Sequence, residues 1–254
     1  MREQVLLAIA LHRRDLGEAD RLASVLTRDE GKLVVTARGS RKPTSKLAPL
    51  IEPFVLAECR VIWGRGELQI LAGGEVVEPF RAMREDLEAF ATGSLLCEVA
   101  DHSLEPGGAA PRLFDLLLDC LRHANSGGCL AVIESYFLLH ASRLLGYGFA
   151  SSACAGCGEE TDGGAAFVSP AAGGVVCDSC RPPEGSPRLS AEAMGQLRSM
   201  RGARLTTTME AAPGRAAIEA VRDALREHVR YHLDSELRSL VVLRSMSAGL
   251  GGSG

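Results

Sequence analysis

Aromatic side chains and long apolar runs are both scarce in this sequence. Aromatic residues make up 4% of the 254 positions, with a single Trp, so the chain cannot present wide stacking surfaces. No apolar run approaches the roughly 18 to 20 residues that span a bilayer. The run from Val5 to Leu11 is too short for a secretory signal, and the polar segment 12–15 ends it. We therefore expect a soluble cytoplasmic protein with no membrane partner.

Motifs of several common enzyme classes are also missing. The chain contains neither the phosphate-binding pattern G-x-x-x-x-G-K-[ST] nor the nucleophile elbow G-x-S-x-G. Gly64-Arg65-Gly66 is too short a signal for a dinucleotide site. His228 and His232 are four residues apart, as in zinc proteases, but Val229 stands where such an enzyme needs Glu. We therefore expect both histidines on a solvated helix face, and a protein that is not an enzyme.

The charge balance is acidic, with a net charge of −4 at pH 7, and taken alone this argues against a nucleic-acid-binding protein. Charge is uneven along the chain, however. Residues 1–80 sum to +1, 81–153 to −4, 154–180 to −4 and 181–254 to +3. Because nucleic-acid binding needs only a local basic patch, the net charge does not exclude it.

The first 80 residues contain short alternating segments that are typical of β-strands. Asp29-Glu30-Gly31 lies between two of them and places Gly where a tight hairpin turn needs a positive φ. Such strands, separated by Gly-rich turns, predict a small barrel such as an OB-fold, although another small barrel or a sandwich would give the same pattern. The expected strands are Val5–His12, Arg21–Thr27, Lys32–Arg38, Phe54–Ile62 and Leu68–Ala72.

From about residue 80 onward, apolar residues recur at helical spacing. Glu85, Asp86 and Glu88 lie near the start of the first expected helix, where negative charges interact favourably with the helix dipole. Ser190 is typical of an N-cap. A Gly-rich tail follows at residues 249–254. The expected helices are Met83–His102, Arg112–His123, Cys129–Leu145, Ala191–Arg201 and residues 215–245.

The spacing of four cysteines is the strongest chemical signal in the chain. Cys154 and Cys157 form one C-x-x-C pair, and after 19 intervening residues Cys177 and Cys180 form another. Two such pairs can direct four thiolates at one metal ion, which is the closed tetrahedral set of a structural zinc site. No coordination position is left for water, so we expect one structural Zn²⁺ and no metal catalysis. A pair of disulfides or an iron–sulfur cluster are the alternatives.

The remaining cysteines fall within strand or helix patterns. We expect them to be small core residues rather than metal ligands. They are Cys59, Cys97, Cys120 and Cys129.

A basic loop is expected between the third and fourth strands. The segment 38–46 carries Arg38, Arg41, Lys42 and Lys46 and no acid, and it could neutralise phosphates. By itself, such a run is more often a solvated loop. On a barrel, it would lie among the loops with which OB-folds contact single strands. Trp63, near the end of a strand, is expected to fill the core rather than to stack on a base.

The assembled pattern resembles the RecO family of recombination mediators. Segments typical of that family occur in its order over most of the chain, and the last of them runs directly into the first cysteine pair. These segments are HRRDLGEADRL (12–22), TRDEGKL (27–33), ARGSRK (37–42), LIEPF (50–54), PRLFDLLL (111–118) and LLGYGF (144–149).

The resemblance implies an α+β multidomain protein: an N-terminal OB-fold barrel, then an α-helical domain that carries a zinc-binding lobe with four cysteine ligands. The expected parts are 1–80 (OB-fold, DNA-binding), 81–150 (helical), 151–183 (zinc-binding insertion), 184–248 (helical, continued) and 249–254 (flexible tail). The resemblance also assigns DNA binding to the loop 38–46 and zinc to the four paired cysteines.

Members of that family bind single- and double-stranded DNA and anneal complementary strands. They partner with RecR and with the C-terminal tail of the single-strand-binding protein, and they help to load RecA onto coated strands. The resemblance therefore implies a bacterial, cytoplasmic, nucleoid-associated protein of DNA repair and recombination. A zinc-ribbon interaction scaffold, an OB-fold RNA-binding factor and, least favoured, a metalloenzyme are the alternative interpretations.

Overall fold

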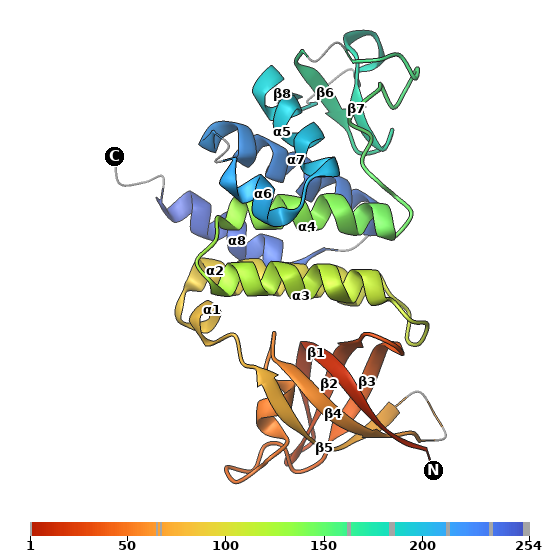
Figure 1. Cartoon of the computed structure of the whole chain (residues 1–254), viewed down its shortest axis with the longest axis vertical. Coiled ribbons are helices and arrows are strands. Elements are labelled where there is room, and N and C mark those ends of the chain that lie inside the picture. The colour runs from red at the N-terminus through yellow and green to blue at the C-terminus, as the bar shows by residue number, and fades with distance from the viewer. Residues whose placement is uncertain are drawn as a thin grey trace. The chain divides into compact units, whose positions relative to one another are not determined.

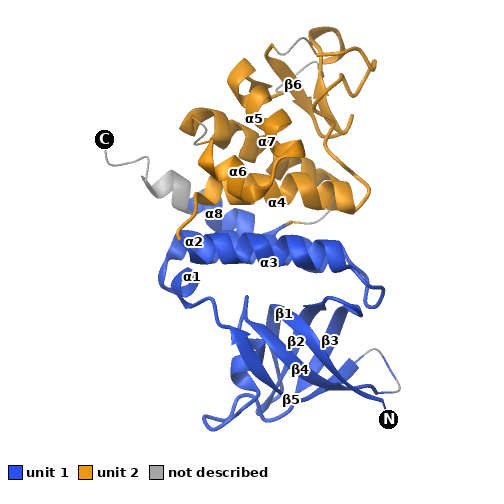
Figure 2. Ribbon diagram, in the orientation of Figure 1, with its two compact units in different colours: residues 1–126, 237–254 blue, residues 127–236 orange. Residues whose placement is uncertain are grey.

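The computed structural model of the chain describes residues 2–64, 66, 68–161, 164–182, 186–211, 214–233 and 236–250. The chain divides into two compact units (Figures 1 and 2). The first unit contains residues 1–126 together with residues 237–254, and the second contains residues 127–236. The domain boundaries expected at residues 80, 150 and 183 remain predictions.

Within the described residues, five strands of the first unit close into a barrel in the order β1-β2-β3-β5-β4, with β4 pairing back to β1. β3 and β5 run parallel, whereas the other neighbours are antiparallel. The predicted OB-like barrel is therefore confirmed, although β1 and β5 are longer than expected. The strands are β1 Glu3–Leu16, β2 Asp20–Thr27, β3 Gly31–Ala37, β4 Leu56–Ile62 and β5 Leu68–Glu78.

The barrel is filled by alternate apolar residues of these strands, such as Leu33 and Val35 of β3. The short 3-10 helix η1 (Ala48–Ile51) adds the buried side chains of Leu50 and Ile51 to this core. Cys59 is part of it, and burial raises the pKa of its thiol to about 11. Trp63 packs against the same core as predicted.

One end of the barrel is fastened to helices of the first unit. Lys32 donates to the backbone carbonyl of Asp101 at 2.5 Å, and the Ser24 hydroxyl donates to the Asp101 carboxylate at 2.5 Å. Gly31, in the predicted hairpin turn (φ +70°), has no room for a side chain, because a Cβ would lie 2.0 Å from the carbonyl oxygen of Gly108. Residues of α2 and of the loop after it therefore cover the end of the barrel that carries the β2–β3 turn. The β1–β2 turn lies at the opposite end of β2.

The helices of the first unit are α1 Arg81–Glu85, α2 Leu87–His102, α3 Pro111–Asn125 and α8 Arg238–Leu250. The single helix predicted over Met83–His102 is wrong, because the helix breaks at Asp86 (φ −110°, ψ 120°). The Asp86 carboxylate accepts a hydrogen bond from the Ala89 N–H at 2.7 Å, so this residue starts a new helix as its N-cap. Cys97 and Cys120 are buried in these helices, as predicted.

The second unit combines helices with a small sheet. Ser190 caps α5 by accepting from the Ala193 N–H at 3.1 Å, as predicted. The strands β7, β6 and β8 pair in that order, and all pairs are antiparallel. The elements are α4 Leu130–Leu144, β6 Ala166–Ser169, β7 Gly174–Val176, the 3-10 helix η2 Asp178–Cys180, β8 Arg188–Leu189, α5 Ala191–Gly202, α6 Leu205–Glu210 and α7 Arg215–Leu233.

Three other predictions are corrected by the structure. The single helix expected over residues 215–245 is two helices, α7 and α8, which belong to different units. Cys129 is exposed before α4, and not a core residue. His228 is fully buried on α7, not solvated, and its Nε2–H donates to the carbonyl of Tyr147 at 2.7 Å. Of the tail expected at residues 249–254, the first two residues belong to α8 and 251–254 lie outside the described residues.

Candidate metal centre and nucleic-acid interface

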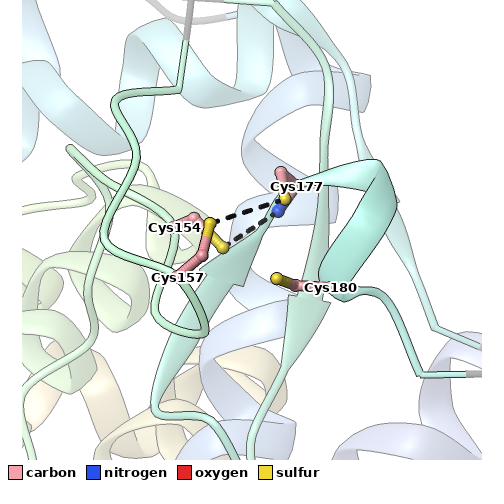
Figure 3. A group of neighbouring side chains, drawn as sticks. All are labelled: Cys154, Cys157, Cys177 and Cys180. Carbon is pink, nitrogen blue, oxygen red and sulfur yellow. Dashed lines mark hydrogen bonds between the residues drawn. The ribbon is translucent and has the colours of Figure 1, made fainter.

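The structure brings the four predicted cysteines into one cluster (Figure 3). Cys154 and Cys157 lie in the loop between α4 and β6, whereas Cys177 follows β7 and Cys180 ends η2. Their sulfur atoms all lie within 4.8 Å of one another. A tetrahedral ion with metal–sulfur bonds of about 2.3 Å needs sulfurs roughly 3.8 Å apart, and the Sγ atoms of Cys157 and Cys177 are separated by 3.8 Å.

The backbone around Cys154 is built to hold a thiolate. Its Sγ accepts hydrogen bonds from the N–H of Cys177 at 3.3 Å and from the N–H of Gly156 at 3.4 Å. Gly156 lies close to the second cysteine pair, because a Cβ at this position would be 3.0 Å from the Cβ of Cys180 and 3.2 Å from its Sγ. A larger residue at this position would therefore push against Cys180.

The thiol pKa values of the cluster favour the binding of a cation. The backbone N–H of Cys177, together with other N–H groups, lowers the pKa of Cys154 to about 6, so a thiolate forms there readily. The neighbouring sulfur of Cys177 raises the pKa of Cys180 to about 12. Four thiolates can therefore coexist only when a positive ion neutralises them. The residues present fit a metal ion, and as a closed set they would hold it without an open position for a reacting ligand.

The second predicted site, the basic loop 38–46 between β3 and η1, is fastened to the β1–β2 turn. Arg41 donates from Nη1 to the carbonyl of Gly17 at 2.6 Å, and its Nε lies 3.5 Å from the Asp15 carboxylate. Asp20 accepts from the N–H of Gly39 at 2.7 Å. Arg41 thus holds the loop in place, which reduces its capacity to contact a ligand directly.

The other three basic residues of the loop are available to a ligand. Arg38, Lys42 and Lys46 are exposed. In the part of the chain that the structure describes, none of the three forms an ion pair. They lie at the end of the barrel that carries the β1–β2 turn, away from the end covered by helices. The chemistry of this surface suits an anion such as a phosphate backbone.

The sequence reasoning missed one further cation beside this loop. Arg14 is exposed on β1, opposite Leu22 of β2, and among the described residues it has no ion-pair partner. Its neighbours are engaged: Arg13 contacts Glu52, and Arg21 donates to Asp15 at 3.0 Å. The signal that could have found Arg14 is strand alternation, which turns its side chain outward on the hairpin that Arg41 contacts.

Among the described residues, no helix is both long enough and apolar enough to cross a membrane.

Comparison with known proteins covers nearly the whole chain. Residues 1–80 match the family profile described as Recombination protein O N terminal, and residues 84–240 match the one described as Recombination protein O C terminal. Relatives named DNA repair protein RecO are similar over most of their length. The protein from Desulforudis audaxviator is 38% identical over 245 residues, which cover 94% of this chain and 95% of the relative. That from Cutibacterium acnes is 34% identical over 244 residues, covering 93% and 96%.

Proposed function

The chain belongs to the RecO family of DNA repair proteins, and on that premise we propose that it is a recombination mediator. It binds single- and double-stranded DNA, anneals complementary strands and helps to load RecA onto strands that the single-strand-binding protein has coated. It acts by binding rather than by catalysis, in the bacterial cytoplasm and at the nucleoid. The interaction scaffold and the RNA-binding factor are the alternatives that the experiment below distinguishes.

The observation that carries this proposal is the exposed, basic loop 38–46 at the end of the barrel that carries the β1–β2 turn. Arg38, Lys42 and Lys46 are exposed there without ion pairs among the described residues, and Arg41 holds their loop on the β1–β2 turn. Each contact with a phosphate releases counterions, so the binding would be strong at low salt in spite of the acidic net charge. A barrel end with this loop can follow a DNA backbone without reading its sequence.

The metal in the second unit is zinc in this proposal. Thiolate ligands select soft or borderline metals, and four of them in a tetrahedral set are typical of structural Zn²⁺. Its role is to stabilise a lobe whose β6–β7–β8 sheet has strands of four, three and two residues. The metal thus supports folding, and it takes no part in a reaction.

The partners in this proposal are RecR, the C-terminal tail of the single-strand-binding protein and, indirectly, RecA. A cleft of about 260 Å³ in the second unit supports a docking place for that acidic, apolar-ended tail. Leu139 and Phe149 provide apolar walls, and Arg143 and Arg201 provide positive charge. Arg143 is exposed and has no ion-pair partner within the described residues, so its charge is available to a carboxylate.

The proposal is tested by strand annealing. Complementary DNA oligonucleotides, bare or coated with single-strand-binding protein, are mixed with the full-length zinc-loaded protein, and annealing is followed by fluorescence at low and moderate salt. The protein should accelerate annealing, and changing Arg38, Arg41, Lys42 and Lys46 together to Ala should abolish the effect. A control with the same change of charge replaces four exposed arginines elsewhere: Arg81, Arg112, Arg204 and Arg215.

Each outcome separates the alternatives. Annealing that is lost in the loop variant but kept in the control supports the mediator and its loop. No acceleration by the zinc-loaded protein at either salt concentration, even with RecR added, would favour the interaction scaffold. A clear preference for RNA over DNA of the same sequence would favour the RNA-binding factor, because it would require contacts to the 2′-hydroxyl.

A further inference from the structure

The small sheet of the second unit carries a partly exposed aromatic residue, Phe167. In β6, Ala166 and Val168 are buried, so strand alternation turns Phe167 to the opposite face, where it is only half-buried. Its partners across the sheet are Val176 of β7 and Arg188 of β8. Val176 is buried whereas Arg188 is exposed, so Phe167 lies at the border of the buried part of this face, and part of its ring remains accessible.

Two guanidinium groups stack near this ring. The Cζ atom of Arg181 lies 5.2 Å from the ring centroid of Phe167, and that of Arg188 lies 5.9 Å from it. Both distances are within the range of cation–π attraction. This attraction holds each guanidinium near the ring, while its N–H groups can still bind an anion.

The charges of both arginines remain available to a ligand. Arg188 is exposed, and none of the described residues forms an ion pair with it. Arg181 lies 3.7 Å from Asp178, but the side chains of this pair are 54% and 83% exposed. An ion pair so accessible to solvent is weak, and salt or a better anion displaces it.

We infer that Phe167, Arg181 and Arg188 form a second contact site for single-stranded DNA, on the metal-binding lobe. An unstacked base packs against the ring and the guanidinium planes, and the guanidinium N–H groups bind the adjacent phosphates. An accessible aromatic ring on a sheet, flanked by arginines, is a combination with which proteins bind unpaired bases. A duplex hides its base faces, so the site selects single strands.

The surroundings make this contact short-ranged. Residues 154–180 contain four acids and no Lys or Arg, so the lobe does not attract DNA from a distance. The two arginines therefore act only on a strand that is already held nearby. The inference rests on the proposed DNA-binding function and adds to it a contact that is separate from the barrel.

The test uses the full-length zinc-loaded protein and an oligo-dT probe that carries 5-iodouracil. Irradiation should crosslink the probe to a peptide that contains Phe167, which mass spectrometry identifies. In fluorescence anisotropy, the double variant Arg181→Gln and Arg188→Gln should raise Kd about five-fold or more. The dependence of log Kd on log salt concentration should fall by roughly 1.4, since each contact with a single-stranded phosphate contributes about 0.7. Phe167→Leu, which keeps both charges, should raise Kd with little change in this dependence.

Arg215→Gln provides the matched control, because this side chain is 92% exposed on α7 of the same unit. It should leave Kd unchanged, and zinc content and melting temperature should stay the same in all variants. The measurements are repeated with the four basic residues of the loop 38–46 changed to Ala. If the loop variant still binds DNA and loses that binding when Arg181 and Arg188 are also changed, the result supports the site. This holds even if the loop itself has no role.

Two results overturn the inference and leave the proposed function standing: crosslinks confined to the barrel, or unchanged affinity in the double variant while the loop variant loses binding. Binding of a polyglutamate probe that depends on Arg181 and Arg188, with oligo-dT binding unaffected, would assign the surface to an acidic peptide instead. If the unmodified protein binds no DNA at any salt concentration, the inference and the proposed function both fail.

Discussion

The guanidinium of Arg226 and the carboxylate of Glu134 form a two-pronged ion pair inside the second unit. The two hydrogen bonds measure 2.5 and 2.8 Å, and the two side chains are only 7% and 2% exposed. Glu134 lies on α4 and Arg226 on α7, so the pair fixes the register of two packed helices. Burial raises the pKa of Glu134, and the contact with Arg226 opposes that effect.

The first prediction follows from the desolvation of this pair. Arg226→Met should destabilise the protein by about 3–5 kcal/mol, because it leaves a carboxylate buried without its counter-charge. The double variant Arg226→Met and Glu134→Leu should recover most of the loss, as urea unfolding can measure. As a control, Arg230→Met removes an exposed partner of Glu227 and should cost less than about 1 kcal/mol. Equal losses for Arg226→Met and Arg230→Met would refute this account.

The second prediction concerns the metal. Cys157→Ser should abolish stable metal binding and destabilise the lobe around the cysteine cluster, because three thiolates cannot close the tetrahedral set. Metal content by mass spectrometry and protease sensitivity of the lobe measure the two effects. Cys129→Ser is the matched control, since that cysteine is also exposed but lies outside the cluster. Full metal retention by Cys157→Ser would contradict the assignment.

The third prediction concerns the exposed cations that would contact DNA. Changing Arg38, Lys42 and Lys46 to Ala should lower the salt dependence of duplex DNA binding by roughly 2–3, because each lost phosphate contact removes about 0.9. Arg14→Ala should remove one further phosphate contact and lower the salt dependence again by about 0.9. Anisotropy titrations between about 50 and 200 mM salt measure both effects. An unchanged slope in the triple variant would move the DNA-binding site away from this loop.

The fourth prediction is a pH dependence of stability. Burial lowers the pKa of His228 to about 4, below its ordinary value of 6.5. The stability that the neutral imidazole contributes is therefore fully present above pH 6.5, and it is lost as the pH falls toward 4, because the unfolded chain takes up the proton first. The loss should amount to roughly 2–3 kcal/mol. The free energy of unfolding of the His228→Gln variant should change less between pH 6.5 and 4 than that of the unmodified protein. If the two proteins change in parallel, His228 is not the cause.

The fifth prediction tests the cleft beside α4. Arg143→Ala should weaken binding of a peptide that copies the C-terminal tail of the single-strand-binding protein by about five-fold or more, because a charge-assisted hydrogen bond contributes roughly 1.5–3 kcal/mol. Leu144→Ala alters the neighbouring exposed residue without changing charge, and should have a smaller effect. Isothermal titration calorimetry compares the two. Equal affinity for the peptide in the Arg143→Ala variant would place the tail elsewhere.

The sequence predicted those features that depend on local patterns. Strand alternation and the turn at Gly31 predicted a small β-domain, the resemblance to the RecO family favoured the OB-fold barrel, and two C-x-x-C pairs sufficed to select the clustered cysteines. Features that depend on tertiary contacts escaped prediction. The carbonyl of Tyr147 satisfies the N–H of the buried His228, and no pattern on α7 reveals a partner so far away in sequence.

The errors at helix ends have a similar origin. The run from Met83 to His102 has continuous helical periodicity, but the capping interaction of Asp86 divides it. The helix expected over 215–245 is divided between the two units, and Glu98 of α2 accepts hydrogen bonds from the N–H groups of Arg238 and Ser239 at the start of α8. A cap that is supplied by a residue 140 positions earlier cannot be read from the segment itself.

The position of α8 also has a consequence for synthesis on the ribosome. Leu237, Leu240 and Leu243 are buried in the first unit, yet they are translated after the whole of the second unit. While the chain grows, the surface of α2 that packs against α8 stays uncovered, although the barrel and its neighbouring helices have long since emerged. The second unit, which is continuous in sequence, can fold during translation. The first unit is completed only after residues 127–236 have been translated, so a nascent chain that stalls before α8 would carry a finished metal lobe and an open, aggregation-prone barrel unit.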